Sequence, residues 1–386
     1  MTHGKRISSG LVAGLGLFIV AALGGAACLS SSSPNPATSD AGGTPTEDGA
    51  ASSTDGGDAA TVVDASDASP STDSGPSDAG PPVEAGIFTE FPIPIDGGAA
   101  SPNGITAGPD GNLWFTEFHA AKVGKITTAG AITEFTTTTA GSFPYSIAAG
   151  SDGNLWFTEN VVNKIGMITP AGAITEYPIP TASSGSFPTD PGPFDITTGP
   201  TGTLWFTANL NDEVGVITTA GAITQFPLPT SGSHPEGLVV GPDGNLWVCD
   251  TIGNNVDKLT PSGTATPYAV PTAGGEPTLI AVGPDGNLWF TEYVGNKIGV
   301  ITTAGAITEY DVPTTNSHPN GITSAPDGNL WFTELDGNKI GKITTAGVVT
   351  ELSVPTANGS PGVITVGSDG NLWFTESIGN IGRLTL

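Results

Sequence analysis

The sequence predicts an all-β protein built as a seven-bladed β-propeller, and a repeated motif carries most of this prediction. The stretch GPDGNLWFTE at residues 108–117 returns in near-identical form until the end of the chain. Self-similarity at a period of about 40–50 residues is typical of solenoids and propellers. The protein has seven tryptophans, one in each copy, at spacings of 42, 49, 42, 42, 42 and 42 residues: Trp114, Trp156, Trp205, Trp247, Trp289, Trp331 and Trp373.

Each repeat contains four short apolar segments that we interpret as strands. From Ser101 the first repeat reads SPNGITAG, PDG, NLWFTE, FHAA, KVGKIT, TAG and AITEFT. No segment has the 3.6-residue apolar period of a helix. We expect Asp110-Gly111 to supply the positive φ angles of a tight hairpin and Ala129-Gly130 to form the next reversal, so that consecutive strands pair antiparallel. Four-stranded sheets repeated around an axis are propeller blades.

The two ends of the array predict that the ring is closed. The last repeat stops at Ile381–Leu386 without a fourth strand, whereas Phe88–Pro94 reads like the fourth strand Ile174–Pro180 yet precedes the first repeat. We therefore expect residues 88–94 to pair with residues 382–386 and complete the last blade, which removes the open sheet edges. The tryptophans are predicted to pack in the core, where each buries roughly 150–250 Å².

The N-terminal part predicts export. Residues 1–27 have Lys5 and Arg6 before an apolar run and are predicted to be a signal peptide. Cys28 follows Gly25-Ala26-Ala27, which resembles a lipobox with Gly in place of the usual Leu, so we expect lipidation at Cys28; the alternatives are cleavage without lipid or an uncleaved anchor. Residues 28–86 are predicted to be a disordered acidic tether rich in Ser, Pro, Gly and Asp. Residues 87–386 form the propeller.

These features predict where the protein acts and what it contacts. We expect an exported lipoprotein of the outer membrane or cell surface, or otherwise a periplasmic or secreted protein, that touches a membrane only through its N-terminal anchor. The formal net charge is −27 and the lysines are spread over the blades, which excludes nucleic acid as a partner. An acidic surface suits cationic ligands or divalent ions. We expect a monomer, and we expect Cys249 to be a small buried side chain.

Acidic residues end the second strand of six repeats, and Ala208 takes this place in the third. We expect these carboxylates on the rim near the axis, where they are suited to binding a divalent cation or acting as general bases: Glu117, Glu159, Asp250, Glu292, Glu334 and Glu376. The alternative is an ion pair with the lysine five residues later, Lys122, Lys164, Lys297 or Lys339. Asp250 and Glu376 have Asn255 and Ile381 at that spacing and are freer for another use, and Ala208 is matched by Glu213.

The residue after the proline that opens each first strand is the least repetitive one in the array. It is Asn103, Tyr145, Phe194, Glu236, Thr278, Asn320 or Gly362. Two residues earlier, the fourth, fifth and sixth repeats have His234, Glu276 and His318, so imidazoles and carboxylates are expected within reach of one another. The insertion at Ser183–Gly192 is predicted to form a lip over the central channel.

From Phe88 to Leu386 the array resembles the virginiamycin B lyase family, whose repeats read GPDGNLWFTE, NKIG and ITEF. The resemblance implies a Mg²⁺-dependent carbon–oxygen lyase that opens streptogramin B antibiotics by elimination at the threonine ester, without water, and thereby confers antibiotic resistance. It implies a Glu-x-His, a Glu fourteen residues beyond that His, and a second His one blade earlier. Glu276-Pro277-Thr278 and Glu292 match the first two elements, but Thr278 and Glu236 stand where the imidazoles are expected.

Three functions follow from these residues. The first is a ligand-binding module for a small molecule or cyclic peptide with a degraded lyase site, in which Mg²⁺ is held by Glu276 and Glu292. Its ligand contacts are expected from Glu236, Thr278, Asn320, Asp250, Glu334 and Glu376. The second is an active lyase in which Glu292 works with His234 or His318. The third is a structural surface protein without a ligand.

Overall fold

The computed structural model describes residues 86–94, 100–180 and 192–386. The predicted signal peptide, the lipidation site Cys28, the tether and residues 183–191 of the predicted lip lie outside the described residues. All described residues belong to the unit Asp78–Leu386. None of the helices in the described ranges is long and apolar enough to cross a membrane.

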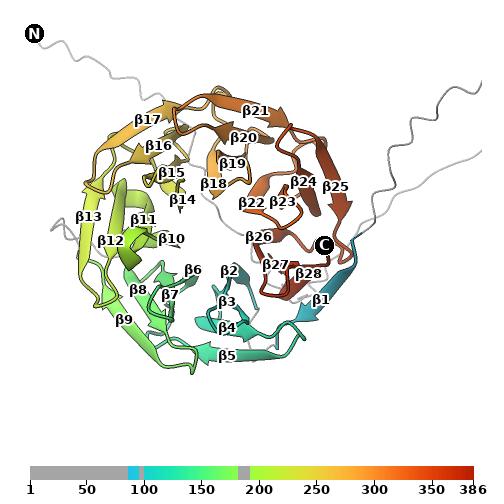
Figure 1. Ribbon diagram of the computed structural model, residues 1–386. Coiled ribbons are helices and arrows are strands. Elements are labelled where there is room, and N and C mark those ends of the chain that lie inside the picture. The colour runs from blue at the N-terminus through green and yellow to red at the C-terminus, as the bar shows by residue number, and fades with distance from the viewer. Residues whose placement is uncertain (1–85, 95–99, 181–191) are drawn as a thin grey trace, which may run out of the picture. The chain divides into compact units, whose positions relative to one another are not determined.

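Seven four-stranded antiparallel sheets form a ring, as Figure 1 shows along its axis. The first strands lie innermost: β2 (Pro102–Ala107), β6 (Pro144–Ala149), β10 (Pro193–Thr198), β14 (Pro235–Val240), β18 (Pro277–Val282), β22 (Pro319–Ser324) and β26 (Pro361–Val366). The second strands follow outward: β3 (Leu113–Glu117), β7 (Leu155–Glu159), β11 (Leu204–Ala208), β15 (Leu246–Asp250), β19 (Leu288–Glu292), β23 (Leu330–Glu334) and β27 (Leu372–Glu376).

The outer half of each blade consists of its third and fourth strands. The third strands are β4 (Lys122–Ile126), β8 (Lys164–Ile168), β12 (Glu213–Ile217), β16 (Asn255–Leu259), β20 (Lys297–Ile301), β24 (Lys339–Ile343) and β28 (Asn380–Leu384). The fourth strands are β5 (Ile132–Thr136), β9 (Ile174–Pro178), β13 (Ile223–Pro227), β17 (Ala265–Ala269), β21 (Ile307–Asp311), β25 (Val349–Ser353) and β1 (Phe88–Pro92). Two single 3₁₀ turns, η1 (Pro200–Gly202) and η2 (Asn209–Asn211), flank β11 in the third blade. The predicted fold class is confirmed.

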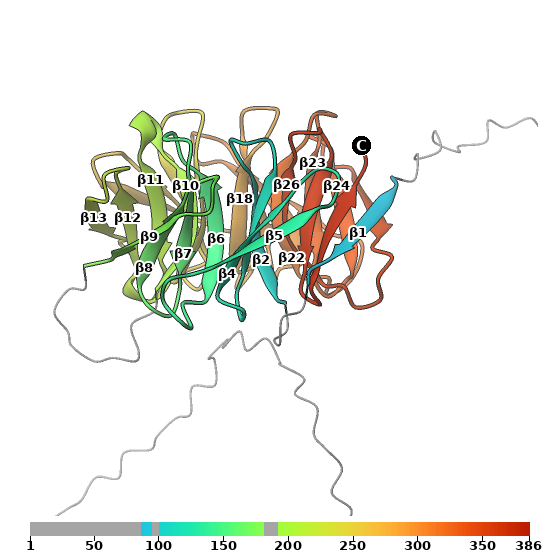
Figure 2. The ribbon, with the colours of Figure 1, turned by 90° about the horizontal axis from the view of Figure 1, so that it is seen from below.

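The strand β1 closes the ring as predicted. It pairs antiparallel with β28, from Phe88 opposite Leu384 to Pro92 opposite Asn380, and Figure 2 shows it beside the last blade. The Phe91 ring stacks on Trp373 at 5.5 Å, as Phe135 stacks on Trp114 at 5.7 Å in the first blade. The borrowed strand therefore reproduces the contacts that a fourth strand makes in a continuous blade.

The hairpin between first and second strands differs in one respect from the prediction. Gly111 has a φ of 79°, but Asp110 does not share this positive φ. Instead the Asp110 carboxylate accepts hydrogen bonds from the Asn112 amide at 3.2 Å and from the Trp114 indole at 3.0 Å. One glycine is enough for this turn because the aspartate side chain satisfies the donors around it.

The core lies along the second strands, which are buried over their whole length. The seven tryptophans are at most 6% exposed, which agrees with the predicted core packing. In six blades the phenylalanine after the tryptophan lies against a glycine of the third strand: a Cβ atom on Gly299 would be 2.2 Å from the Phe290 ring. A side chain larger than hydrogen is therefore excluded wherever this phenylalanine is present.

Candidate functional site

A cavity of about 160 Å³ lies among the innermost strands, lined by residues from six of the seven first strands. Five of the variable residues that follow the opening proline line it: Asn103, Tyr145, Phe194, Thr278 and Asn320. The isoleucines two residues later complete much of the wall: Ile105, Ile147, Ile196, Ile280, Ile322 and Ile364. We call the seven residues after the opening prolines the variable ring.

A bulge at the start of each first strand positions the variable ring. The register between β2 and β3 shifts between Pro102 and Ile105, and the same shift recurs in the other described blades. The second-strand threonine spans this bulge: Thr116 accepts from the Gly104 amide at 2.9 Å and donates to the Tyr145 carbonyl of the next blade at 2.7 Å. A recurring contact thus fixes the backbone of six of the seven variable residues.

The hydrogen bond from the second-strand threonine to the next blade is missing in the fourth blade. The corresponding hydroxyls bond the carbonyls of Phe194, Glu236, Asn320, Gly362 and Asn103. In the fourth blade Cys249 replaces the threonine, so the Thr278 carbonyl receives no such bond. Cys249 is fully buried, as predicted. The Thr278 hydroxyl donates to the carbonyl of Glu276 at 3.0 Å.

Two carboxylates stand on the first strands. Asp195 accepts hydrogen bonds from the Ser146 hydroxyl at 2.6 Å and from the Ile196 and Leu238 amides at 2.9 and 3.1 Å. Glu236 is only 7% exposed and has no such partner among the described residues. Burial, with a smaller effect from the charges of Glu276 and Asp195, raises the pKa of Glu236 to about 8.

The residues that precede the opening prolines are held in an unusual conformation. Five of them are not glycine yet have φ between 48° and 54°: Phe143, His234, Glu276, His318 and Ser360. Such a conformation costs roughly 1–2 kcal/mol for a residue with a Cβ atom. Backbone strain of this kind clusters at functional sites.

His318 is the better ordered of the two candidate histidines. Its Nδ1 lies 2.6 Å from a carboxylate oxygen of Asp336, and its ring stacks on Tyr293 with centroids 4.5 Å apart. Burial raises the pKa of Glu276, and the nearby His318 opposes this shift. His234 is half-buried and is held through its backbone amide, which donates to Asp212 at 3.3 Å.

The carboxylates that end the second strands do not lie on an open rim, so this prediction is wrong. Asp250, Glu292, Glu334 and Glu376 are completely buried, and none of them lines the cavity. The loop between blades covers them: Cβ atoms on Gly275 and Gly295 would be 2.6 and 2.7 Å from the Glu292 carboxylate. These glycines leave room for the carboxylate beneath the loop and no path to the axis.

Burial raises the pKa of five of the six carboxyl groups that end the second strands. It raises the pKa of Glu292 to about 8 and the pKa of Glu334 and of Glu376 to about 7. Both carboxylate oxygens of Glu292 and of Glu334 lack a hydrogen bond. Asp250 differs, because it accepts from the Gly253 amide at 2.8 Å and from Asn255 at 3.3 Å.

The lysines that follow these glutamates form their hydrogen-bonded ion pairs elsewhere than predicted. Lys339 contacts Glu351 of the fourth strand at 2.7 Å, and Lys164 contacts Glu176 at 2.7 Å. In the third blade Glu213 accepts from Gln225 at 2.7 Å, at the same place in the sheet. The residue opposite Glu376 is Asn380 and not Ile381, because the last turn is shorter.

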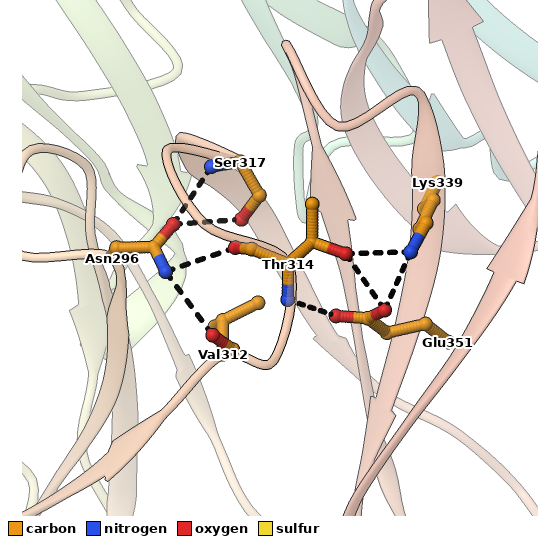
Figure 3. A network of polar contacts seen from close by, with 6 residues as sticks. All are labelled: Asn296, Val312, Thr314, Ser317, Lys339 and Glu351. Atoms are coloured by element: carbon orange, nitrogen blue, oxygen red, sulfur yellow. Dashed lines mark hydrogen bonds and ion pairs between the residues drawn. The ribbon is translucent and has the colours of Figure 1, made fainter.

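These ion pairs belong to a network that clamps the loop between blades, shown in Figure 3 for the fifth and sixth blades. Glu351 accepts from the amide and the hydroxyl of Thr314, both at 2.8 Å. Asn296 donates to the carbonyls of Val312 and Thr314 and accepts from the amide and hydroxyl of Ser317. The second-strand glutamates are thus covered by a loop that neighbouring blades hold from both sides.

The predicted metal ligands receive no specific support. Within the described ranges, no three side chains of His, Cys, Asp or Glu converge on a common point that suits a metal ion. Glu292 has the same buried surroundings as Glu159 and Glu334, so nothing distinguishes it as a ligand. The residues present do not fit a Mg²⁺ site at Glu276 and Glu292.

Sequence reasoning missed three residues near the variable ring. Asp195 is charged where the other first strands have Gly, Ser, Leu or Val, and this contrast was a signal that it has a special role. Tyr293 and Asp336 lie in the turns after β19 and β23, where the copies also differ. Asp336 contacts His318 within the sixth blade, whereas Tyr293 reaches His318 from the fifth blade, which no spacing within a single repeat predicts.

Comparison with known proteins agrees with this architecture. The sequence profile of the virginiamycin B lyase family matches residues 50–190 and 186–386. A streptogramin B lyase structure superimposes with a TM-score of 0.73 at 39% identity, covering 78% of this chain and 98% of that one. Virginiamycin B lyase from Staphylococcus aureus gives 0.72 at 38%, covering 78% and 100%. A catalytically inactive variant of that enzyme, with a histidine changed to alanine, is known with quinupristin and matches equally well. No curated protein sequence matches this chain.

Proposed function

Since this chain belongs to the virginiamycin B lyase family, we propose that it binds a small molecule or cyclic peptide at its axial cavity and no longer cleaves it. One observation carries the proposal: none of the seven variable-ring residues is a histidine. The family resemblance places the proton-abstracting imidazole in this ring, so its loss holds whichever blade is aligned with the family's catalytic one.

The residues that occupy the two expected positions are poor bases. The Thr278 hydroxyl donates to a backbone carbonyl and has no useful basicity near neutral pH. Glu236, with a pKa of about 8, is mostly protonated there. Loss of a general base costs typically 10²–10⁴-fold in rate. The cavity and its polar and aromatic lining remain, which supports binding over elimination.

The test uses the full chain with quinupristin as the probe. Calorimetry measures binding, and chromatography with fragmentation mass spectrometry detects the linear product, which has the same mass as the substrate after an elimination. We expect binding without linearisation, and linearisation to appear in Thr278→His combined with Glu236→His. Turnover by the unaltered chain, or the absence of any binding, contradicts the proposal.

A second candidate is an active lyase that uses His318. The contact between Nδ1 and Asp336 leaves Nε2 as the nitrogen suited to accept a proton, and Glu276 is near enough for His318 to oppose the rise of the Glu276 pKa. This candidate predicts turnover of a cyclic ester that His318→Ala abolishes and His234→Ala leaves intact. The same assay with EDTA and with added Mg²⁺ tests whether a divalent ion participates.

We also propose that the protein is exported and tethered through a lipid on Cys28, followed by the acidic segment 28–86. The apolar run before Cys28 and the composition of the tether support this proposal. Membrane fractionation of Cys28→Ser tests it, because unchanged membrane association would show that a lipid on Cys28 does not anchor the protein.

A further inference from the structure

The positive charges of the propeller are kept away from its axis. Every lysine and arginine of the described residues lies on a third strand: Lys122, Lys125, Lys164, Lys258, Lys297, Lys339, Lys342 and Arg383. The first strands carry only two charged residues, Asp195 and Glu236. The innermost layer therefore has acidic groups and no cation of its own to balance them.

Asp195 and Glu236 differ in whether the protein itself supplies partners for the carboxyl group. Asp195 already accepts three hydrogen bonds, so its charge is stabilised by the protein. The carboxyl group of Glu236 has neither a hydrogen bond nor an ion pair among the described residues, although the residue is more than nine-tenths buried. An unpaired buried carboxylate is costly, and a cationic ligand group would supply the missing partner.

Aromatic rings occupy the neighbouring places in the variable ring. Phe194 on β10 is adjacent to Glu236 on β14 in the order of the first strands, and Tyr145 on β6 comes next. The rings of Tyr145 and Phe194 are 4.1 Å apart and both line the cavity. Their environment is electrically linked to Glu236, whose charge contributes to raising the pKa of Tyr145. Aromatic faces attract organic cations.

We propose that Glu236, Phe194 and Tyr145 form a subsite for a small organic ammonium group. The inference deepens the proposed binding function and rests on it, since it names the chemical class of the ligand. When the cation binds, the Glu236 carboxyl group gives up its proton to solvent, and the resulting carboxylate supplies the counter-charge. The two rings and the isoleucines of the cavity wall contact the apolar part of the ligand.

The size of the cavity and its lining select the kind of cation. A volume of about 160 Å³ is close to that of cavities that hold a benzene-sized molecule. A divalent metal ion prefers six or more oxygen ligands, whereas the described residues bring no three acidic or imidazole groups together. Glu236 is not among the residues that line the cavity, but its strand β14 packs between β10 and β18, whose Phe194 and Thr278 do line it. An ammonium group on a small aromatic body fits two rings in the cavity with this carboxylate at its edge.

The experiment compares benzylamine, which is a cation at pH 7, with benzyl alcohol, which has a similar shape and no charge. Calorimetry on the full chain is expected to show benzylamine binding at least about tenfold more tightly. Glu236→Gln should abolish this preference while keeping the shape of the side chain. Phe194→Leu should weaken benzylamine binding several-fold. Asp311→Asn removes one charge from the exposed outer strand β21 and should change nothing.

Each other outcome overturns the inference. Equal binding of the two probes, or a preference that survives Glu236→Gln, shows that the carboxylate does not recognise the charge. Binding of Mg²⁺ that depends on Glu236, without binding of benzylamine, assigns the site to a metal ion instead. Quinupristin is measured in parallel: if it binds while benzylamine shows no preference, the ammonium subsite is wrong and the proposed binding function stands. If neither binds, both are wrong.

Discussion

The fourth and fifth blades have the same architecture but differ at the positions that hold the other blades together. In the fifth blade Phe290 lies over Gly299, Thr291 bonds the next blade, and Lys297 contacts Asp311 at 2.9 Å. The fourth blade replaces the corresponding residues with Val248, Asp257, Cys249 and Asn255, and Pro267 stands where the fifth blade has Glu309. The only unpaired carboxylate of the first strands, Glu236, is in this blade as well.

This difference shows which repeated contacts stabilise the ring and in which blade those contacts are lost. The outer layers of the blades repeat the same contacts because each contact closes a gap between neighbours. Departures from the repeat accumulate in the blade that contains Glu236. Val248, Asp257 and Cys249 replace a phenylalanine, a glycine and a threonine that all six other copies retain. Natural proteins give up local consistency mainly at functional sites, which agrees with the ligand subsite that we propose at Glu236.

The largest expected effect comes from restoring the consensus pair in the fourth blade. Val248 is directly opposite Asp257 in the sheet, and the Asp257 carboxylate is buried without a hydrogen bond, with its pKa raised to about 7 by burial. Val248→Phe with Asp257→Gly removes this carboxylate and adds apolar burial. We expect the free energy of unfolding to rise by about 2–4 kcal/mol, measured by urea denaturation.

The single substitutions are the controls for this pair. Val248→Phe alone places a ring against Asp257 and should destabilise the protein by about 1–3 kcal/mol. Asp257→Gly alone should be nearly neutral, because it removes the carboxylate but leaves a void. The comparison between blades fails if the double variant equals the sum of the two single ones, since the argument requires that phenylalanine and glycine fit only together.

A smaller effect is expected from the loop clamp that the blades share. Asn296 makes four hydrogen bonds to the loop between the fifth and sixth blades, so Asn296→Ala should lower the free energy of unfolding by about 2 kcal/mol. Asn316→Ala is the matched control. Asn316 has the same positive φ of 52° but is exposed in the loop, and equal effects of the two substitutions would show that backbone strain and not the clamp is responsible.

The fold was predictable because its determinants lie within one repeat. Trp289 and Gly286 have counterparts at the same spacing in the other repeats. Residues 88–94 have nearly the same sequence as the fourth strand at residues 174–180. These features depend on local pattern, which a sequence displays directly.

The electrostatics of the site were not predictable in the same way. Glu292 and Lys297 are opposite one another in the sheet, yet the lysine reaches outward to the fourth strand and the glutamate is covered by the interblade loop. Side-chain direction and loop coverage depend on the neighbouring blade. The stacking of Tyr293 on His318 crosses the same boundary, and no single repeat contains that information.

The smallest expected effect concerns the pH dependence of stability in the consensus blades. Burial raises the pKa of Glu292 to about 8, above its ordinary value of 4.5. The folded protein therefore binds this proton more tightly than the unfolded chain does. The resulting stabilisation is complete below pH 4.5 and is lost as the pH rises through about 8, so the free energy of unfolding should fall between pH 5 and pH 8.5.

Glu292→Gln removes one of these titrating groups. Because the charge of Lys297 opposes the shift, the loss of stability over this pH range should shrink by only about 1 kcal/mol, measured by urea denaturation at several pH values. Asp311→Asn, on the exposed end of the same sheet, should leave the slope unchanged. An unaltered slope in Glu292→Gln would mean that its carboxylate is as well solvated in the folded protein as in the unfolded chain, and the contrast with hydrogen-bonded Asp250 of the fourth blade would disappear.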